Sequence, residues 1–240
     1  MIDLYRGDCL EVMDELIAKG VMVDAIVTDP PFNTTACHWD KLIPFEPMWE
    51  QLNRIIKPNG AIVLFGSEPF SSALRMSNIK NYRYDWKWLK EYSVGFMNAN
   101  KMPLKSYEDV LVFYNRLPTY NPQGLTEINK KTKRKKDKST TVYNDMRLKE
   151  GRYIQKFTNY PKDRIMVSKE KTIHPTQKPV ALMEYLIKTY TNENELVLDF
   201  TMGSGTTGVA CKNLNRNFIG IELEKEYYDI AVERINSEGN

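Results

Sequence analysis

The stretch Asp199–Gly208, DFTMGSGTTG, decides how this sequence of 240 residues folds. It follows the apolar run Glu195–Leu198 (ELVL), which is typical of a buried strand, and it leads into helical spacing over Thr207–Leu214. A glycine-rich turn between a strand and a helix lets the backbone approach a ligand closely. The next predicted strand, Phe218–Ile221, ends at Glu222, whose carboxylate can accept hydrogen bonds from both hydroxyls of a ribose. These residues predict a site for a nucleoside cofactor.

A second segment, Asp29-Pro30-Pro31-Phe32, follows the apolar run Val23–Thr28 and also marks the end of a strand. Each proline restricts its own backbone and that of the preceding residue, so the turn is stiff. The Asp29 carboxylate and the Pro30 carbonyl can accept the two hydrogens of an exocyclic amine. Phe32 offers a face on which a planar base can stack, a contact worth roughly 1 to 3 kcal/mol. A strand-ending acid followed by a core phenylalanine is the structural alternative.

Strand-like and helix-like segments alternate along most of the chain, which predicts an α/β fold with a doubly wound, mostly parallel sheet. From residue 117 to 172 the sequence is polar, basic and poorly periodic, so this part can bury little apolar surface by itself. We therefore expect a core of residues 1–116 and 173–240 that carries 117–172 as an insertion. The residues Lys57-Pro58-Asn59-Gly60 predict a turn before the next strand.

Positive charge is concentrated in one short stretch, although the net charge of the chain is only +3. Such a run is most often a solvated loop. In a chain with other reasons to bind nucleic acid, it is expected to contact phosphates and to release counterions. The basic residues of the stretch are Lys130, Lys131, Lys133, Arg134, Lys135, Lys136 and Lys138.

Composition argues against several other classes of protein. The apolar content of 42% is ordinary for a globular protein, and the apolar runs are too short to span a membrane. The N-terminal residues lack the pattern of a signal peptide, so we expect a cytoplasmic protein. The three cysteines (Cys9, Cys37, Cys211) are widely spaced, and the two histidines (His38, His174) lie far apart, so no metal site is expected.

The glycine pattern formed by Gly203, Gly205 and Gly208 fits a nicotinamide dinucleotide and S-adenosylmethionine equally well. Dinucleotide-binding domains usually begin with this unit, whereas here it comes last in the chain. A dehydrogenase also has no use for the Asp-Pro-Pro-Phe segment. The order of the segments therefore favours S-adenosylmethionine over an oxidoreductase cofactor.

Four segments taken in order resemble the amino-directed (adenine-N6 or cytosine-N4) DNA methyltransferases whose catalytic segment precedes the cofactor segment. The segments are GDC at 7–9, DPPF at 29–32, HPTQKP at 174–179 and DFTMGSGTTG at 199–208. The resemblance implies a circularly permuted Rossmann-like methyltransferase fold. Strands Ile2–Tyr5 and Val23–Thr28 become the third and fourth of the core, and the C-terminal third supplies the first and second. Residues 117–172 correspond to a target-recognition region.

The resemblance also implies roles for individual residues. Asp29, Pro30, Pro31 and Phe32 are expected to hold the target base and its amine. The residues expected to bind S-adenosylmethionine are Asp8, His174, Thr176, Gln177, Lys178, Asp199, Gly203, Ser204, Gly205, Thr206, Thr207 and Glu222. The family usually has Phe two residues after the leading Asp, but here Thr201 holds that position. We therefore assign no role to the displaced Phe200.

The implied reaction is methyl transfer from S-adenosylmethionine to the N6 amine of an adenine that is flipped out of duplex DNA. Adenine is preferred because the cytosine members commonly have Ser where Asp29 stands. The alternatives are a cytosine-N4 DNA methyltransferase, an RNA base methyltransferase and a non-catalytic DNA-binding subunit. Duplex DNA is the expected partner. The sequence leaves open whether the chain forms a homodimer and whether a cognate restriction endonuclease acts separately on the same site.

Overall fold

The computed structural model describes residues 1–33, 40–134, 151–168 and 177–237. It divides the chain into a core unit, Met1–Asn121 with Asp163–Asn240, and an insertion unit, Pro122–Lys162. Several residues of the sequence predictions lie outside the described residues, namely Cys37, His38, Lys135, Lys136, Lys138, His174 and Thr176.

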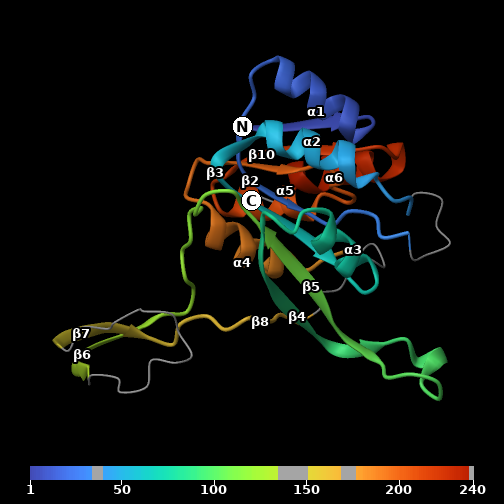
Figure 1. Ribbon diagram of the computed structural model, residues 1–240. Helices are drawn as coiled ribbons and strands as arrows, with labels where there is room; N and C mark the ends of the chain where they lie inside the picture. Colours follow the sequence, from blue (N-terminus) through green and yellow to red (C-terminus); the bar gives the residue numbers. More distant parts are fainter. Residues whose placement is uncertain (34–39, 135–150, 169–176, 238–240) are drawn as a thin grey trace. The chain divides into compact units, whose positions relative to one another are not determined.

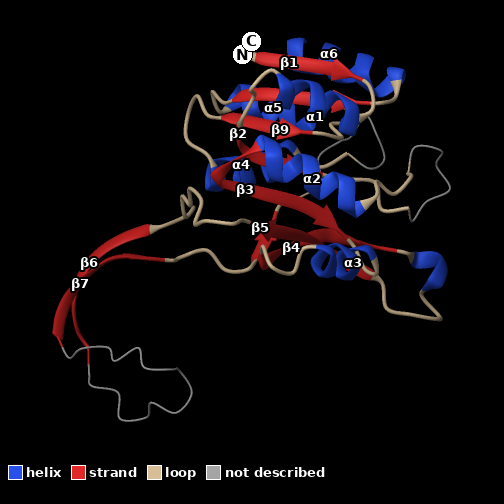
Figure 2. Cartoon of the chain, turned by 45° about the horizontal axis from the view of Figure 1, so that its top comes forward, coloured by secondary structure: helices blue, strands red, loops and turns tan. Residues whose placement is uncertain are grey.

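Among the described residues, the core unit contains one sheet of eight strands, in the order β1-β10-β9-β2-β3-β5-β4-β8 (Figures 1 and 2). The five neighbouring strands β1, β10, β9, β2 and β3 are parallel to one another, and β5 runs antiparallel to both of its neighbours, β3 and β4. The strands are β1 (Ile2–Arg6), β2 (Val23–Thr28), β3 (Ile56–Gly66), β4 (Tyr82–Val94), β5 (Lys105–Phe113), β8 (Arg164–Met166), β9 (Leu196–Asp199) and β10 (Asn217–Glu222).

The two ends of the chain meet in this sheet. β1 pairs in parallel with β10, and β10 pairs with β9, which in turn pairs with β2. The C-terminal strands β9 and β10 therefore stand between the N-terminal strands β2 and β1. This order confirms the circularly permuted α/β fold, in which β9 and β10 act as the first two strands and β1 and β2 as the third and fourth.

Helices cover both faces of the sheet (Figure 2). Successive residues of a strand point to opposite faces, so neighbouring residues pack against different helices. Ile26 packs with the helices α1 to α3, whereas its neighbour Val27 packs with α4 to α6. The helices are α1 (Cys9–Ala18), α2 (Phe45–Ile55), α3 (Phe70–Ser77), α4 (Val180–Tyr190), α5 (Thr206–Asn213) and α6 (Lys225–Ser237), with a short 3-10 helix η1 (Phe96–Asn98). The doubly wound arrangement is confirmed.

The predicted turn at residues 57–60 is absorbed into a strand. β3 begins at Ile56, which pairs with Val23, and the next pair joins Ala61 to Ala25. The four residues between them bulge out opposite Asp24, and Lys57 Nζ lies 2.7 Å from the Asp24 carboxylate. The residues that interrupt the strand are thus accommodated without ending it.

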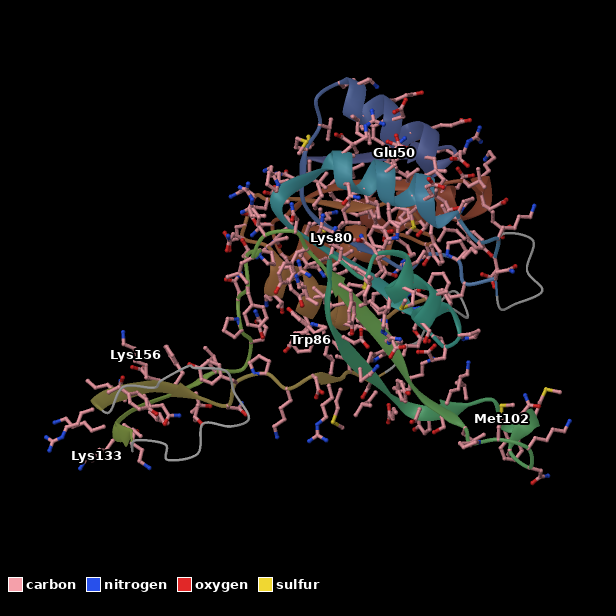
Figure 3. All side chains as sticks on the ribbon, viewed as in Figure 1. Glu50, Lys80, Trp86, Met102, Lys133 and Lys156 are labelled. Atoms are coloured by element: carbon pink, nitrogen blue, oxygen red, sulfur yellow. The ribbon has the colours of Figure 1, made fainter. Side chains whose placement is uncertain are left out.

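The insertion unit is an antiparallel hairpin of β6 (Thr126–Arg134) and β7 (Gly151–Thr158). The basic residues Lys130, Lys131 and Lys133 lie on β6, so this part of the basic stretch is a strand and not the loop that its composition suggested. Figure 3 shows Lys133 on β6 and Lys156 on β7. Within the described parts of the chain, no helix is long and apolar enough to cross a membrane.

Candidate active site

A cavity of about 920 Å³ opens at the carboxyl ends of four neighbouring parallel strands of the core unit. Parallel strands end at the same edge of a sheet, so segments that are distant in the sequence meet there. Asp8 follows β1, Asp29 follows β2, and the glycine loop follows β9. Glu222 ends β10. The side of the cavity toward β4 and β5 is lined by Trp88, Lys90, Tyr107 and Glu108, among others.

Most of the predicted site residues lie on the wall of this cavity. They are Asp8, Asp29, Pro30, Pro31, Phe32, Gln177, Lys178, Asp199, Gly203, Ser204, Thr206, Thr207 and Glu222. Gly205 is absent from the wall, since it packs behind the loop. A Cβ at Gly205 would lie 2.9 Å from the Cβ of Ala231, and its φ of 80° is left-handed. Only glycine fits this position, where the loop turns into α5.

Glu222 ties the glycine loop to the end of β10. Its Oε2 accepts a hydrogen bond from the Gly203 amide at 2.9 Å, and its Oε1 accepts one from the Glu224 amide at 2.8 Å. Burial raises the pKa of Glu222 above its usual value. Each carboxylate oxygen has two lone pairs, so both can still accept a hydroxyl group of a ligand.

Asp8 has a local structural role in addition to its place on the wall. Its Oδ1 accepts from the amides of Leu10 at 2.8 Å and Glu11 at 3.4 Å, which caps the N-terminus of α1. The sequence Gly7-Asp8-Cys9 is therefore a helix start as well as a candidate cofactor contact.

Asp199 lies at the centre of a buried hydrogen-bond network. Thr28 donates to Oδ1, and Thr207 donates to Oδ2 at 2.5 Å. The Thr201 amide also donates to Oδ1, at 3.1 Å. Burial raises the pKa of Asp199 to about 6, although these hydrogen bonds oppose the rise.

Thr201 connects the cofactor side of the cavity to the amine side, a role that sequence reasoning missed. Its hydroxyl lies 3.2 Å from the Asp29 backbone carbonyl and 2.8 Å from the Thr28 hydroxyl, and its single hydrogen can be donated to either. The position that departs from the family's usual Phe thus helps to fix the backbone of Asp29. The displaced Phe200 is buried in the core beside Leu198.

Asp29 belongs to an ionic cluster that contains Lys178 and Glu108. Lys178 Nζ lies 2.5 Å from Asp29 Oδ2 and 3.2 Å from Glu108 Oε2. Lys90 Nζ lies 2.5 Å from the other oxygen of Glu108. The second oxygen of Asp29, Oδ1, is buried and accepts no hydrogen bond from any described residue. This oxygen is free to accept a hydrogen from a ligand.

The charges in the cluster are unevenly shared. Although burial opposes it, the two ammonium groups of Lys178 and Lys90 hold the pKa of Glu108 below its usual value. Burial raises the pKa of Asp29, which shares one ammonium with Glu108, although Lys178 opposes the rise. Burial also disfavours a charged Lys178, but attraction to Asp29 and Glu108 raises its pKa to about 12. Lys178 is therefore a permanent positive charge beside Asp29.

Phe32 and Ser204 are held by residues that the sequence did not point to. The Phe32 ring stacks on Phe70 with a centroid distance of 4.8 Å. Arg234, near the end of α6, is buried and donates from Nη1 to the Ser204 carbonyl at 2.7 Å and to its hydroxyl at 3.0 Å. Gln177 Oε1 lies 3.5 Å from the same hydroxyl.

The two described cysteines, Cys9 and Cys211, are not suited to act as nucleophiles or metal ligands. Burial raises the pKa of Cys9 to about 12 and that of Cys211 well above its ordinary value. Both are therefore protonated thiols at neutral pH, which are poor nucleophiles and poor metal ligands.

Comparison with known proteins places the chain in a family. The family model described as DNA methylase, of the N6/N4 class, matches residues 23–233. The type II methyltransferase M.HpaI of Haemophilus parainfluenzae is 32% identical over 228 residues, which cover 91% of this chain and 69% of that protein. M2.LlaDCHI of Lactococcus lactis subsp. cremoris is 30% identical over 97% of this chain and 88% of its own length.

A solved structure extends the likeness to three dimensions. The crystal structure of M1.HpyAVI in complex with SAM shares 33% of its sequence with this chain. The match has a TM-score of 0.67 and covers 98% of this chain and all of the other. On the family match, on these relatives and on the shared fold, the chain belongs to the N6/N4 family of DNA methylases.

Proposed function

We propose that this chain transfers a methyl group to the N6 amine of an adenine flipped out of duplex DNA. The observation that carries the proposal is the buried Oδ1 of Asp29, which accepts no hydrogen bond from any described residue and belongs to a residue on the wall of the cavity. A buried acceptor without a donor costs free energy unless a ligand supplies one. An exocyclic amine supplies such a donor.

The cofactor is S-adenosylmethionine, which supplies an electrophilic methyl group when it is bound. The residues present fit it. The left-handed Gly203 lies on the wall with open space beside its Cα, which leaves room for close approach, and the carboxylate of Glu222 stands where ribose hydroxyls can be bound. Asp8 and the threonines of the loop, Thr206 and Thr207, complete the part of the wall that would hold the nucleoside.

The residues of the chain act on the amine by position and charge. Asp29 Oδ1 and the Pro30 carbonyl would accept the two amine hydrogens, which draws the nitrogen lone pair out of conjugation with the ring. The carboxylate is then in place to stabilise the positive charge that develops on the nitrogen. Thr201 and the two prolines hold the Asp29 backbone in place, so alignment supplies much of the catalysis. The methylated nitrogen would then release one of its hydrogens as a proton, which gives the neutral product, and no covalent intermediate on the protein is required.

Adenine is proposed over cytosine because the segment begins with an ionisable acid, Asp29, where cytosine-N4 members commonly have Ser. Duplex DNA is proposed as the substrate because the family acts on DNA and because Lys130, Lys131 and Lys133 give the insertion unit a strongly basic strand. We propose that this unit carries target recognition.

The experiment is to express the chain in a host that lacks DNA methylation, and to analyse its nucleosides by mass spectrometry. We expect N6-methyladenine in the DNA of cells with the wild-type chain and none with Asp29→Ala. The matched control is Asp3→Ala, an acid on β1 that does not line the cavity. Calorimetry should show that Asp29→Ala still binds S-adenosylmethionine.

Other outcomes identify the alternatives. Detection of N4-methylcytosine in the DNA would show that the target base is cytosine and not adenine. Methylated RNA with unmodified DNA would make the chain an RNA methyltransferase. Cofactor binding without any methylated nucleic acid would mean a non-catalytic DNA-binding subunit.

A further inference from the structure

β4 and β5 form a hairpin that continues well beyond the body of the core unit. Every residue from 91 to 107 is exposed, whereas Trp86 and Trp88 of the same β4 strand are buried. In Figure 3 Trp86 lies where the strand crosses the core unit, and Met102 lies near the projecting end. The hairpin is therefore an arm that internal packing does not explain.

The tip of the arm is apolar. Phe96 is 83% exposed and Met97 is 97% exposed, and both lie in the short helix η1 that follows the left-handed Gly95. Met102 and Leu104 add exposed apolar surface on the returning side. Large apolar side chains exposed together on a projecting tip indicate a surface that another molecule covers.

The charge of the arm indicates what kind of molecule covers its tip. Between Glu91 and Glu108 the sequence contains no acidic residue and two lysines, Lys101 and Lys105. Lys105 also donates to Ser67 Oγ at 3.3 Å, which connects the arm to the loop after β3. An apolar tip that is followed by ammonium groups and carries no carboxylate suits a stack of bases flanked by phosphates.

The arm also stands at the rim of the active-site cavity. Tyr92, Val94 and Lys105 line the same cavity as Asp29, and Val94 pairs with Lys105 at the last rung of the ladder. Phe96 follows Val94 by two residues, so it lies within about 7 Å of the rim. The tip is thus beside the opening through which a flipped base must enter.

We infer that the tip of this arm inserts into the duplex, where Phe96 and Met97 fill the space that the flipped base leaves. The inference rests on the proposed function, because it requires a base that leaves the stack. Extruding a base removes its stacking contacts, and an apolar side chain in the gap replaces them. Phe and Met are among the side chains that proteins insert between base steps.

A second copy of the chain is the competing occupant, and the arm suits it less well. In a twofold contact between two tips, the lysines of one arm would face those of the other. The tip also offers only a few side chains, whereas a stable interface buries about 1,200 Å² or more.

The test uses two double variants. The tip variant carries Phe96→Ser and Met97→Ser together, and the control variant carries Met76→Ser and Ile79→Ser, which changes exposed apolar residues elsewhere on the core unit. The recognised site is first read by sequencing DNA from cells that express the wild-type chain. Two duplexes with this site are then used, one fully paired and one in which the target base is mispaired. Single-turnover methylation is measured on both, and calorimetry checks that each variant binds S-adenosylmethionine like the wild type.

We expect the tip variant to methylate the paired duplex at least about tenfold more slowly than the wild type. It should methylate the mispaired duplex at close to the wild-type rate, because a mispaired base costs less free energy to flip. The control variant should match the wild type on both duplexes. Equal rates for tip variant and wild type on the paired duplex would overturn the inference. So would equal losses on both duplexes together with a change from dimer to monomer in sedimentation, which would assign the tip to a second copy. Failure of the wild type on every duplex would instead contradict the proposed function.

Discussion

Lys178 donates to Oδ2 of Asp29 at 2.5 Å, while Oδ1 of the same carboxylate accepts no hydrogen bond from any described residue. The lysine thus stabilises the ionised form of Asp29 through one oxygen and leaves the other for a ligand. Glu108 competes for the same ammonium at 3.2 Å. The protonation of Asp29 therefore depends on two residues that come from different elements of the fold.

Replacing Lys178 with Met should move the pH dependence of methylation. Asp29 must be ionised to stabilise the positive charge that develops on the amine, and loss of the ammonium raises its pKa further, since burial already raises it. We expect the acidic limb of the kcat profile to move to a pH that is higher by about 1 to 3. Rates measured from pH 5 to 9 at saturating cofactor and DNA decide the point.

The control is Lys90→Met, which removes an ammonium that contacts Glu108 but not Asp29. Its profile should move less than that of Lys178→Met. An acidic limb at the same pH in all three proteins would show that Asp29 does not control the reaction.

Replacing Glu222 with Ala should weaken the binding of S-adenosylmethionine. The change removes the proposed acceptor for the ribose hydroxyls and also the bond that holds the Gly203 amide at 2.9 Å. Hydrogen bonds to a charged group are worth roughly 1.5 to 3 kcal/mol each, so the dissociation constant should rise by about tenfold or more. Calorimetry measures it, with the exposed Glu226→Ala on α6 as the control. An unchanged constant in a folded variant would leave Glu222 a purely structural role.

The sequence predicted those parts of the site that follow strand ends. Asp29, Asp199 and Glu222 each follow a buried apolar run, and parallel strands bring such ends to one edge of the sheet. These strand ends depend on local patterns, which a single sequence contains. The order of the strands was implied by the resemblance to the methyltransferase family and not by local patterns.

The sequence could not predict features that depend on register or on distant packing. Glu108 meets Lys178 because β5 pairs antiparallel between β3 and β4, and no local pattern sets that register. Arg234 reaches the glycine loop only because α6 packs against α5. The projecting arm of β4 and β5 is a further feature that the sequence analysis did not indicate.

Asp199 should make the folded chain less stable as the pH rises. Its pKa is about 6 in the folded chain against an ordinary 3.8, so the folded state binds the proton more tightly. The resulting stabilisation is fully present below about pH 4 and is lost as the pH rises through about 6. The loss amounts to about 3 kcal/mol, because a tenfold difference in proton affinity between the folded and unfolded states is worth about 1.4 kcal/mol.

Urea unfolding of the wild type and Asp199→Asn at pH 4, 5, 6 and 7 measures this effect, since Asn keeps the shape but does not titrate. The free energy of unfolding of the wild type should fall relative to that of the variant over this range. Asp229→Asn, an exposed change on α6, is the control for loss of a carboxylate. A difference that stays constant from pH 4 to pH 7 would contradict the raised pKa.

The basic strand β6 should bind DNA through phosphates and not through bases. Lysine ammonium groups neutralise charge well but impose no bidentate geometry on a base edge. Replacing Lys130, Lys131 and Lys133 together with Ala should therefore weaken binding to cognate and non-cognate duplexes alike. The slope of log affinity against log salt should become shallower by roughly 0.9 for each phosphate contact that is lost.

Titration of fluorescent duplexes at several salt concentrations measures both quantities for this basic-strand variant. The matched control replaces three exposed lysines of the core unit, Lys19, Lys80 and Lys225, with Ala, so that the net charge changes equally. The control should keep the wild-type slope if the contacts are local to β6. A basic-strand variant that keeps the slope but no longer discriminates between sites would show that β6 reads bases. Equal effects in both variants would mean that binding responds only to total charge, and the insertion unit would then lose its proposed role in holding DNA.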